Sequence, residues 1–347
     1  MKFYGFTKKE ILLFFKQMAL SRQLDQKQLI LLKQGKGFFH IGAAGHEAAQ
    51  IAAGSCFTPG HDYAFPYYRD QALCLQWGMT SREILLSFLA RKDDPNSAGR
   101  QMPQHYGHKK LNIVSQSSPT GTQYLQAVGA AFACKRAEKN AVVYVSSGEG
   151  TTSQGDFHEA LNWASREKAP VIFHIENNGY AISVPVEEQT AGGSIYKIAA
   201  GYESLARFNV NGTDLFETRL AFEKAVERAR KGKGPGIIVS NVVRLFPHSS
   251  SDDQRKYRKQ EELEADQLRD PLNLFKLKCL ESGICTEKDF DSIIEEVKNQ
   301  VNEDTLWAES KESPSPETVD THLFSLDNSI DHSMKKPEKT GDNIVLV

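Results

Sequence analysis

The sequence predicts an α/β protein with a mainly parallel β-sheet flanked by helices. Two apolar runs, 142–145 and 171–175, enclose a stretch with helical patterning, which is typical of a strand–helix–strand unit. A second such unit follows at 208–246, and repeated units of this kind extend a parallel sheet. Of the 347 residues, 40% are hydrophobic and 25% are charged, as expected for a globular protein with a substantial core.

Charge and cysteine content exclude several classes of function. The net charge of −2 gives no general attraction to nucleic acid or to an anionic membrane. The first twenty residues lack a signal-peptide layout, and no apolar run is long enough to span a bilayer. Five cysteines without a C-x-x-C pair predict reduced thiols in a cytoplasmic protein, and their spacing does not favour a zinc site.

Two helices are expected near the amino terminus. Residues 7–34 read as one long helix that Thr7 caps together with Glu10, and we expect it to pack as an arm against a neighbour. The small residues of 42–53 allow close helix packing. His46 and Glu47 lie in that segment, and two interpretations remain open: a functional pair, or an ordinary helix start with a Glu in its first turn.

The segment 62–72, "DYAFPYYRDQA", is predicted to be a loop that leads into a helix. Tyr68 and Arg69 lie there, and the planar fork of an arginine matches the oxygens of a diphosphate. The alternative is a surface ion pair between Arg69 and Asp70.

Two more loops precede the first strand–helix–strand unit. Residues 80–92 read as a helix with a Thr80–Glu83 capping box, followed by the proline- and glycine-containing loop 93–107. In 117–123, "SSPTGTQ", many oxygens lie close together in sequence. They could hold a monovalent cation or a phosphate, or they could simply cap the helix that follows.

Polar residues follow both strands of the first unit, "GEG" at 148–150 and "ENNG" at 176–179. Because the carboxyl ends of parallel strands meet at one edge of a sheet, Glu149 and Asn178 should converge. A carboxylate, an amide oxygen and a backbone carbonyl form a hard oxygen set that suits Mg²⁺. The competing interpretation is a solvated Glu in a turn and an ordinary Asn-Gly turn.

The remainder of the chain completes the predicted organisation. A polar loop, 247–258 or "PHSSSDDQRKYR", should lie at the same sheet edge and be mobile until something binds it. Composition and patterning divide the chain into an N-terminal helical arm (1–40), an α/β domain (41–258), C-terminal helices (259–310) and a linker or tail (311–347).

Gly-Glu-Gly followed after 26 residues by Asn-Asn resembles the signature of thiamine diphosphate enzymes, in which the first motif is Gly-Asp-Gly. Seven motifs in order extend the likeness to the alpha subunit of the decarboxylating first component of a 2-oxo acid dehydrogenase complex, most closely the branched-chain type. They are "AAGHEAAQ", "FPYYRD", "GRQMPQHYG", "SSPTGTQ", "GEGTTSQGD", "ENNGYAIS" and "PHSSSDD". The resemblance implies a thiamine diphosphate-binding fold.

The resemblance also implies residue roles. Mg²⁺ would be held by Glu149, Asn178 and the backbone oxygen of Tyr180. The implied cofactor-binding residues are Tyr68, Arg69, Ser118, Thr120, Gly148, Glu149, Gly150, Asn178, Tyr180, Arg244 and His248. His248 would also help to pass the acyl group to lipoamide. A structural K⁺ site of some members matches Ser117, Pro119, Thr122 and Gln123. Ser249 corresponds to a regulatory phosphorylation site of eukaryotic members, where phosphate beside two aspartates would disorder the loop.

The implied reaction is oxidative decarboxylation of a branched-chain 2-oxo acid with acyl transfer to lipoamide on an acyltransferase component. Pyruvate or acetoin as substrate, or a non-catalytic regulatory paralogue, are the alternatives. In this family a glutamate of the beta subunit activates the cofactor, so the chain alone should be inactive and an α₂β₂ heterotetramer active. The last residues, "GDNIVLV", read as an apolar strand and predict an alpha half fused to a beta half. Two residues depart from the family pattern: Glu149 replaces an Asp, and Glu176 stands where some members have an Arg on the diphosphate.

Overall fold

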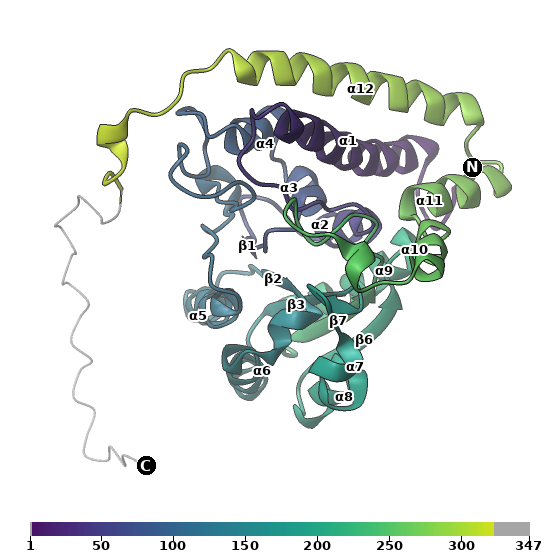
Figure 1. Ribbon diagram of the computed structural model, residues 1–347. Helices are drawn as coiled ribbons and strands as arrows, with labels where there is room; N and C mark the ends of the chain where they lie inside the picture. The colour runs from purple at the N-terminus through teal and green to yellow at the C-terminus, as the bar shows by residue number, and fades with distance from the viewer. Residues whose placement is uncertain (1, 323–347) are drawn as a thin grey trace, which may run out of the picture.

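The computed structural model describes residues 2–322, and its centre is a five-stranded sheet (Figure 1). The strand order is β1-β2-β3-β7-β6, and every neighbouring pair is parallel. The strands are β1 (Tyr63–Phe65), β2 (Val143–Gly148), β3 (Val171–Asn177), β6 (Ala206–Asn211) and β7 (Gly236–Asn241). The predicted α/β class with a mainly parallel sheet is therefore confirmed. A short antiparallel pair, β4 (Tyr180–Ala181) and β5 (Val184–Pro185), follows β3.

The first strand corrects the predicted loop at 62–72. Tyr63, Ala64 and Phe65 pair in parallel with Val143, Tyr144 and Val145 of β2. The Asp62 carboxylate accepts a hydrogen bond of 2.8 Å from the Val142 amide and so ties the start of β1 to β2. Three residues are too few to show a strand periodicity in sequence, and the pairing partner lies about eighty residues away in the chain.

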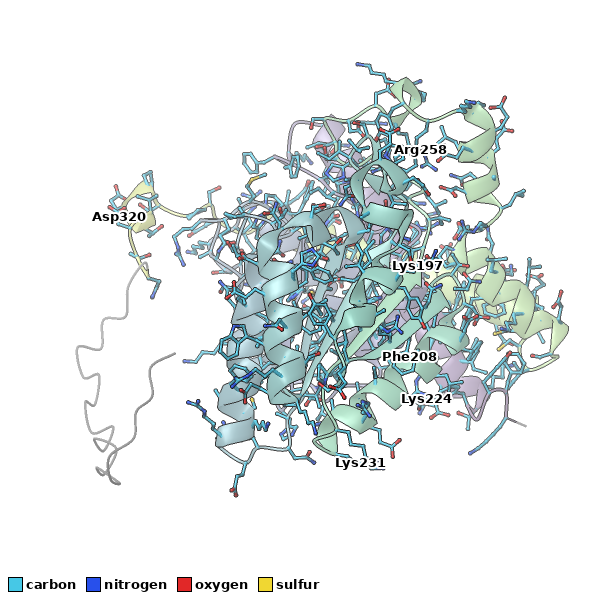
Figure 2. All side chains as sticks on the ribbon, turned by 90° about the horizontal axis from the view of Figure 1, so that it is seen from below. Lys197, Phe208, Lys224, Lys231, Arg258 and Asp320 are labelled. Atoms are coloured by element: carbon cyan, nitrogen blue, oxygen red, sulfur yellow. The ribbon has the colours of Figure 1, made fainter. Side chains whose placement is uncertain are left out.

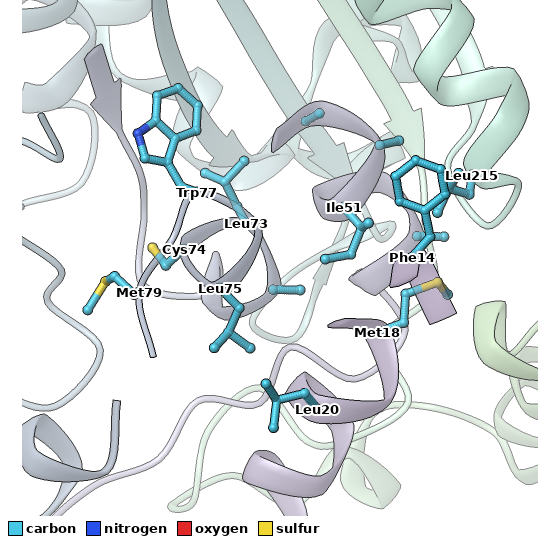
Figure 3. Close-up of a cluster of buried hydrophobic side chains, with 14 of the residues drawn as sticks. Phe14, Met18, Leu20, Ile51, Leu73, Cys74, Leu75, Trp77, Met79 and Leu215 are labelled. Atoms are coloured by element: carbon cyan, nitrogen blue, oxygen red, sulfur yellow. The ribbon is translucent and has the colours of Figure 1, made fainter. Parts of the chain in front are cut away.

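Helices cover both faces of the sheet, which a parallel sheet requires because its strands are apolar on both sides. On one face lie α1 (Lys8–Lys33), α2 (Glu47–Gly54), α3 (Gln71–Gln76), α4 (Ser81–Phe88), α9 (Leu215–Arg230), α11 (Pro271–Glu281) and α12 (Glu287–Glu309). Tyr144, Ile172 and Ile238 of the strands join this cluster. Figure 3 shows part of it, with Ile51 and Trp77 fully buried.

The opposite face is covered by α5 (Thr122–Arg136), α6 (Gly155–Glu167) and α8 (Ile195–Ile198). Val143 and Val145 point to this side, whereas Tyr144 between them points to the other, as expected for the two-residue period of a strand. The remaining helices are α7 (Val186–Gln189), α10 (Gln260–Gln267), η1 (Lys109–Leu111), η2 (Glu149–Ser153), η3 (Ala191–Gly193), η4 (Ala199–Gly201), η5 (Gln254–Lys256) and η6 (Pro316–Thr318).

The long amino-terminal helix was predicted to within one residue at each end. Thr7 and Glu10 form the expected capping box, and so do Thr80 and Glu83, although α4 ends four residues before the predicted 92. Figure 1 shows α1 lying alongside α12, and its buried face includes Ile11 and Phe15. The predicted arm therefore packs against helices of its own chain.

Two further sequence expectations concern the ends of the chain and the membrane. Within residues 2–322, no helix has both the length and the apolarity that a membrane crossing requires. The apolar run "GDNIVLV", together with most of the predicted linker, lies outside the described residues.

Candidate active site

A cavity of about 270 Å³ lies where the carboxyl ends of β2 and β3 meet the segment after β1. This is the edge at which parallel sheets bind ligands. Lys231 lies before β7 in the chain and Arg258 lies after it, and Figure 2 shows these two residues toward opposite ends of the molecule. The cavity lies at the end that carries Arg258. The lining residues are Tyr67, Tyr68, Arg69, Thr120, Gly148, Glu149, Gly150, Thr151, Asn178, Tyr180, Ala181, Ile182 and His248.

Sequence reasoning had named most of this lining but not all of it. It missed Tyr67, Thr151, Ala181 and Ile182. All four lie within the motifs "FPYYRD", "GEGTTSQGD" and "ENNGYAIS", so membership of a motif is the signal that could have found them.

Glu149 begins η2 and is 1% exposed. Its Oε2 accepts a hydrogen bond of 3.1 Å from the backbone amide of Asn178, so the two residues do converge. Its Oε1 is buried and has no hydrogen-bond partner within the described part of the chain. Burial raises the pKa of Glu149, while hydrogen bonds to backbone amides and the nearby Arg244 and Arg69 act in the opposite direction. A buried carboxylate oxygen without a donor beside a cavity fits a cation ligand.

The amide of Asn178 adds a second oxygen. Its Oδ1 accepts a hydrogen bond of 3.2 Å from the Tyr180 amide, which leaves one lone pair free. Together with a backbone carbonyl, these oxygens fit Mg²⁺.

The two glycines of the motif serve different purposes. A Cβ on Gly150 would lie 2.8 Å from the Cβ of Ala181, so the backbones approach too closely for any side chain. A Cβ on Gly148 would have only Tyr67 Cε2 near it, at 4.0 Å. Gly150 is therefore needed for packing, whereas Gly148 leaves space in the cavity wall.

Arg69 is 2% exposed and is held from two sides. Its Nη1 donates a hydrogen bond of 2.5 Å to the Gly42 carbonyl, and its Nη2 lies 3.4 Å from both Nδ1 and the backbone oxygen of His248. The alternative of a surface pair with Asp70 is wrong, because Asp70 is fully buried and accepts hydrogen bonds from the Ser146 hydroxyl and the Tyr67 amide instead.

His248 lies on the loop 247–258, which the structure fixes by several hydrogen bonds. The His248 amide donates to Asp252 Oδ2 at 2.8 Å, and the Tyr257 hydroxyl donates to the same oxygen at 2.5 Å. Burial lowers the pKa of His248 to about 3, assisted by Arg69 and Arg244. The imidazole is therefore neutral at physiological pH. Mobility of this loop before binding stays a prediction.

Two predicted cofactor residues do not line the cavity. Ser118 is exposed, and its Oγ lies 2.7 Å from His105 Nε2. Arg244 is buried behind the cavity wall, where it donates to the Ile182 carbonyl at 3.0 Å and to the Tyr257 hydroxyl at 2.7 Å. Arg244 therefore joins the lining to the loop that carries His248.

The predicted K⁺ set lies where the loop 117–121 meets α5. Thr122 Oγ1 donates to the Pro119 carbonyl at 3.1 Å. The Gln123 amide donates to the Ser146 carbonyl at 3.0 Å and accepts from the Gly121 amide at 3.1 Å. These bonds tie the loop to β2. Cation binding by Ser117 and the other three residues stays a prediction.

Glu176 does not line the cavity, although it stands at the position where some family members have an Arg that binds the diphosphate. It is fully buried, and its Oε2 lies 2.6 Å from His46 Nδ1, 2.9 Å from Gln50 Nε2 and 3.1 Å from the Tyr67 hydroxyl. The pKa of Asp70 lies well above its usual value, mainly because the carboxyl group is buried. The charge of Glu176 and a hydrogen bond with Glu176 raise this pKa further. Burial also raises the pKa of Glu176, while hydrogen bonds with Asp70, Gln50 and Tyr67 act in the opposite direction.

Comparison with known proteins identifies the family of the chain. Residues 15–317 match the family described as "Dehydrogenase E1 component". The chain is 41% identical over 321 residues to "2-oxoisovalerate dehydrogenase subunit alpha" of Bacillus subtilis, covering 92% of this chain and 97% of that protein.

Two other relatives are more distant. The chain is 33% identical to "3-methyl-2-oxobutanoate dehydrogenase subunit alpha" of Mycobacterium tuberculosis, over 79% of this chain and 71% of that protein. It is 34% identical to "Pyruvate dehydrogenase E1 component subunit alpha" of Staphylococcus aureus, over 85% and 77%. Since the family match spans most of the sequence, the chain belongs to the dehydrogenase E1 component family.

Proposed function

We propose that this chain is the alpha subunit of a thiamine diphosphate-dependent enzyme that oxidatively decarboxylates a branched-chain 2-oxo acid and transfers the acyl group to lipoamide. The observation that carries the proposal is the cavity in which Glu149 presents a buried, unpartnered oxygen beside Asn178. The 41% identity to the Bacillus 2-oxoisovalerate dehydrogenase subunit supports the branched-chain substrate.

The cofactor, when bound, supplies the carbon nucleophile and the electron sink for loss of CO₂. The residues of this chain bind and orient its diphosphate end. Glu149, Asn178 and the backbone oxygen of Tyr180 would hold Mg²⁺, and Arg69 would meet the phosphate oxygens. Its guanidinium is already fixed by the Gly42 carbonyl, so little conformational entropy is lost when the diphosphate binds.

Neutral His248 would complete the set of cofactor contacts in the cavity. A neutral imidazole can both donate and accept a hydrogen bond, which suits binding of the diphosphate and acyl transfer. Tyr68, Thr120, Gly148 and Gly150 provide the walls. Arg244 would act from beyond the lining through the Ile182 carbonyl. Ser118, which lies outside the lining beside His105, stays a predicted cofactor residue. Ser117, Pro119, Thr122 and Gln123 would bind K⁺.

The proposed active species is an α₂β₂ heterotetramer, since no residue in the described cavity suits the role of the glutamate that activates the aminopyrimidine. The beta subunit, separate or fused, would supply it, and a lipoyl-bearing acyltransferase would accept the acyl group. A cytoplasmic location is part of the proposal, supported by five free cysteines.

A pyruvate dehydrogenase is the second candidate, because the Staphylococcus relative carries that name at 34% identity. The deciding experiment compares 3-methyl-2-oxobutanoate with pyruvate, using an artificial electron acceptor, thiamine diphosphate and Mg²⁺, for this chain with and without its beta partner. Activity that needs the partner and is faster with the branched substrate supports the proposal. Faster turnover of pyruvate would replace the substrate, and no activity with either despite cofactor binding would refute the assignment.

A further inference from the structure

His46 contacts Asn178, which lines the cavity, but does not line the cavity itself. It precedes α2 and is fully buried. The preceding Gly45 has a φ of +99°, and a Cβ there would meet the Val243 carbonyl oxygen at 2.1 Å, so a sharp turn against the end of the sheet places the imidazole where it is. Its two nitrogens contact residues from the same strand end: Nδ1 lies 2.6 Å from Glu176 Oε2, and Nε2 lies 3.4 Å from the Nδ2 of Asn178.

The directions of these hydrogen bonds follow from groups that have only one role. The Tyr180 backbone amide can only donate, and it lies 3.2 Å from the Asn178 side chain, so the amide oxygen of Asn178 faces it. The amide nitrogen of Asn178 then faces His46 and needs an acceptor. Nε2 of His46 must therefore carry a lone pair, and Nδ1 must carry the ring proton.

The contact with Glu176 agrees with that tautomer. Glu176 Oε2 also receives hydrogen bonds from the Gln50 side-chain amide and the Tyr67 hydroxyl, at 2.9 and 3.1 Å. An oxygen that accepts from these two donors is suited to accept a third from Nδ1–H. Glu176 thereby sets the tautomer of His46, and His46 in turn sets the orientation of the Asn178 amide.

We propose that His46 is a positioning residue for the metal site: by accepting a hydrogen bond from Asn178 Nδ2, it keeps the Asn178 amide oxygen available as a metal ligand. This inference rests on the proposed function, in which Asn178 is a Mg²⁺ ligand. It also gives Glu176 a role, as the residue that fixes the ring of His46. Partners of this kind typically change metal affinity by about 10- to 100-fold when they are removed.

Two substitutions separate the two ends of the imidazole. In His46→Asn the side-chain amide reaches only the position of Nδ1, so it retains a donor for Glu176 and loses the acceptor for Asn178. In His46→Gln the amide reaches the position of Nε2, so it retains an acceptor for Asn178 and loses the donor to Glu176. Both variants carry a side-chain amide, and they differ only in which of the two contacts, with Glu176 or with Asn178, is retained.

The experiment measures Mn²⁺ binding by electron paramagnetic resonance at a fixed thiamine diphosphate concentration, in the enzyme assembled with its beta partner. We expect His46→Asn to weaken Mn²⁺ binding by about tenfold or more and His46→Gln to bind close to the wild type. Thermal unfolding of the metal-free proteins checks that both are folded. Equal affinity in both variants, whether unchanged or weakened, would overturn the proposal, and so would weakening in His46→Gln alone.

A further variant distinguishes failure of this inference from failure of the proposed function. Glu149→Gln should weaken Mn²⁺ binding by roughly 100-fold if the metal site is where we place it. Weaker Mn²⁺ binding in Glu149→Gln together with unchanged Mn²⁺ binding in His46→Asn would refute only the role of His46. Unchanged Mn²⁺ binding in Glu149→Gln would refute the metal site itself. If His46→Asn does not fold, ¹⁵N-histidine NMR of the wild type provides the test, because a proton on Nε2 of His46 would contradict the assignment.

Discussion

The unbalanced carboxylate of Glu149 is the residue-scale feature on which the site depends. One oxygen is satisfied by the Asn178 amide, and the other has neither a donor nor water-exposed surface within residues 2–322. Leaving such a group without a partner is costly, so a bound cation would recover free energy that the protein alone gives up. The extra methylene relative to an aspartate keeps both oxygens and changes only the reach.

We predict that Glu149→Gln weakens Mg²⁺-dependent binding of thiamine diphosphate by roughly 100-fold, since the negative charge is removed and a donor is placed in an acceptor position. Glu149→Asp should weaken it less, because the charge remains and only the reach changes. Both affinities are measured by titrating each variant with thiamine diphosphate at several Mg²⁺ concentrations and following the quenching of protein fluorescence. Indistinguishable affinity in Glu149→Gln and the wild type would remove Glu149 from the metal site.

The two motif glycines should respond differently to alanine. Gly150→Ala places a methyl 2.8 Å from the Ala181 Cβ, so we expect overpacking to lower the free energy of unfolding by about 1–3 kcal/mol. Gly148→Ala meets only Tyr67, at 4.0 Å, and should fold normally while narrowing the cavity. Urea unfolding and cofactor titration of both variants provide the check, and loss of stability in Gly148→Ala would show that the space beside it is already filled.

At the scale of elements, local sequence patterns predict helices and strands, whereas contacts between residues far apart in the chain cannot be predicted from them. Continuous apolar runs located β2 and β3, helical spacing located α1, and capping residues marked the starts of α1 and α4. The three-residue β1 shows neither pattern, so the sequence predicts a loop there. The convergence of Glu149 and Asn178 followed from strand polarity alone. The contacts of Glu176 with His46 and Gln50 join residues more than one hundred positions apart, and no periodicity encodes them.

One helix offers a stabilising substitution. Gly129 is exposed in the middle of α5, and a Cβ there would have no atom within 4 Å. We predict that Gly129→Ala raises the free energy of unfolding by about 0.5–1 kcal/mol, because alanine loses less backbone entropy in a helix than glycine does. Chemical unfolding measures the change. A decrease in stability in the assembled enzyme, but not in the isolated chain, would place this face of α5 against the partner.

At the scale of the whole molecule, the helices on both faces of the sheet bury nearly every thiol. Cys74 and Cys279 are fully inaccessible, and the half-buried Cys56 points its sulfur at the Ala52 and Arg219 carbonyls, at 3.5 and 3.8 Å. Burial raises the pKa of Cys56 and of Cys279 to about 12. The reactive thiolate form is therefore rare in the folded protein near neutral pH.

We predict that the native chain reacts slowly with a thiol reagent at pH 8 and that all five thiols react at once in denaturant.

The pH dependence of the free energy of unfolding has a definite sign. A folded-state pKa above the unfolded value of about 8.5 means that the contribution to stability is complete below that pH and is lost as the pH rises toward about 12. The alkaline decrease in the free energy of unfolding should be smaller in Cys279→Ala than in the wild type, measured by urea unfolding from pH 7 to 10. A slope that is unchanged in Cys279→Ala, or rapid labelling of the native chain, would show that this side of the core admits water.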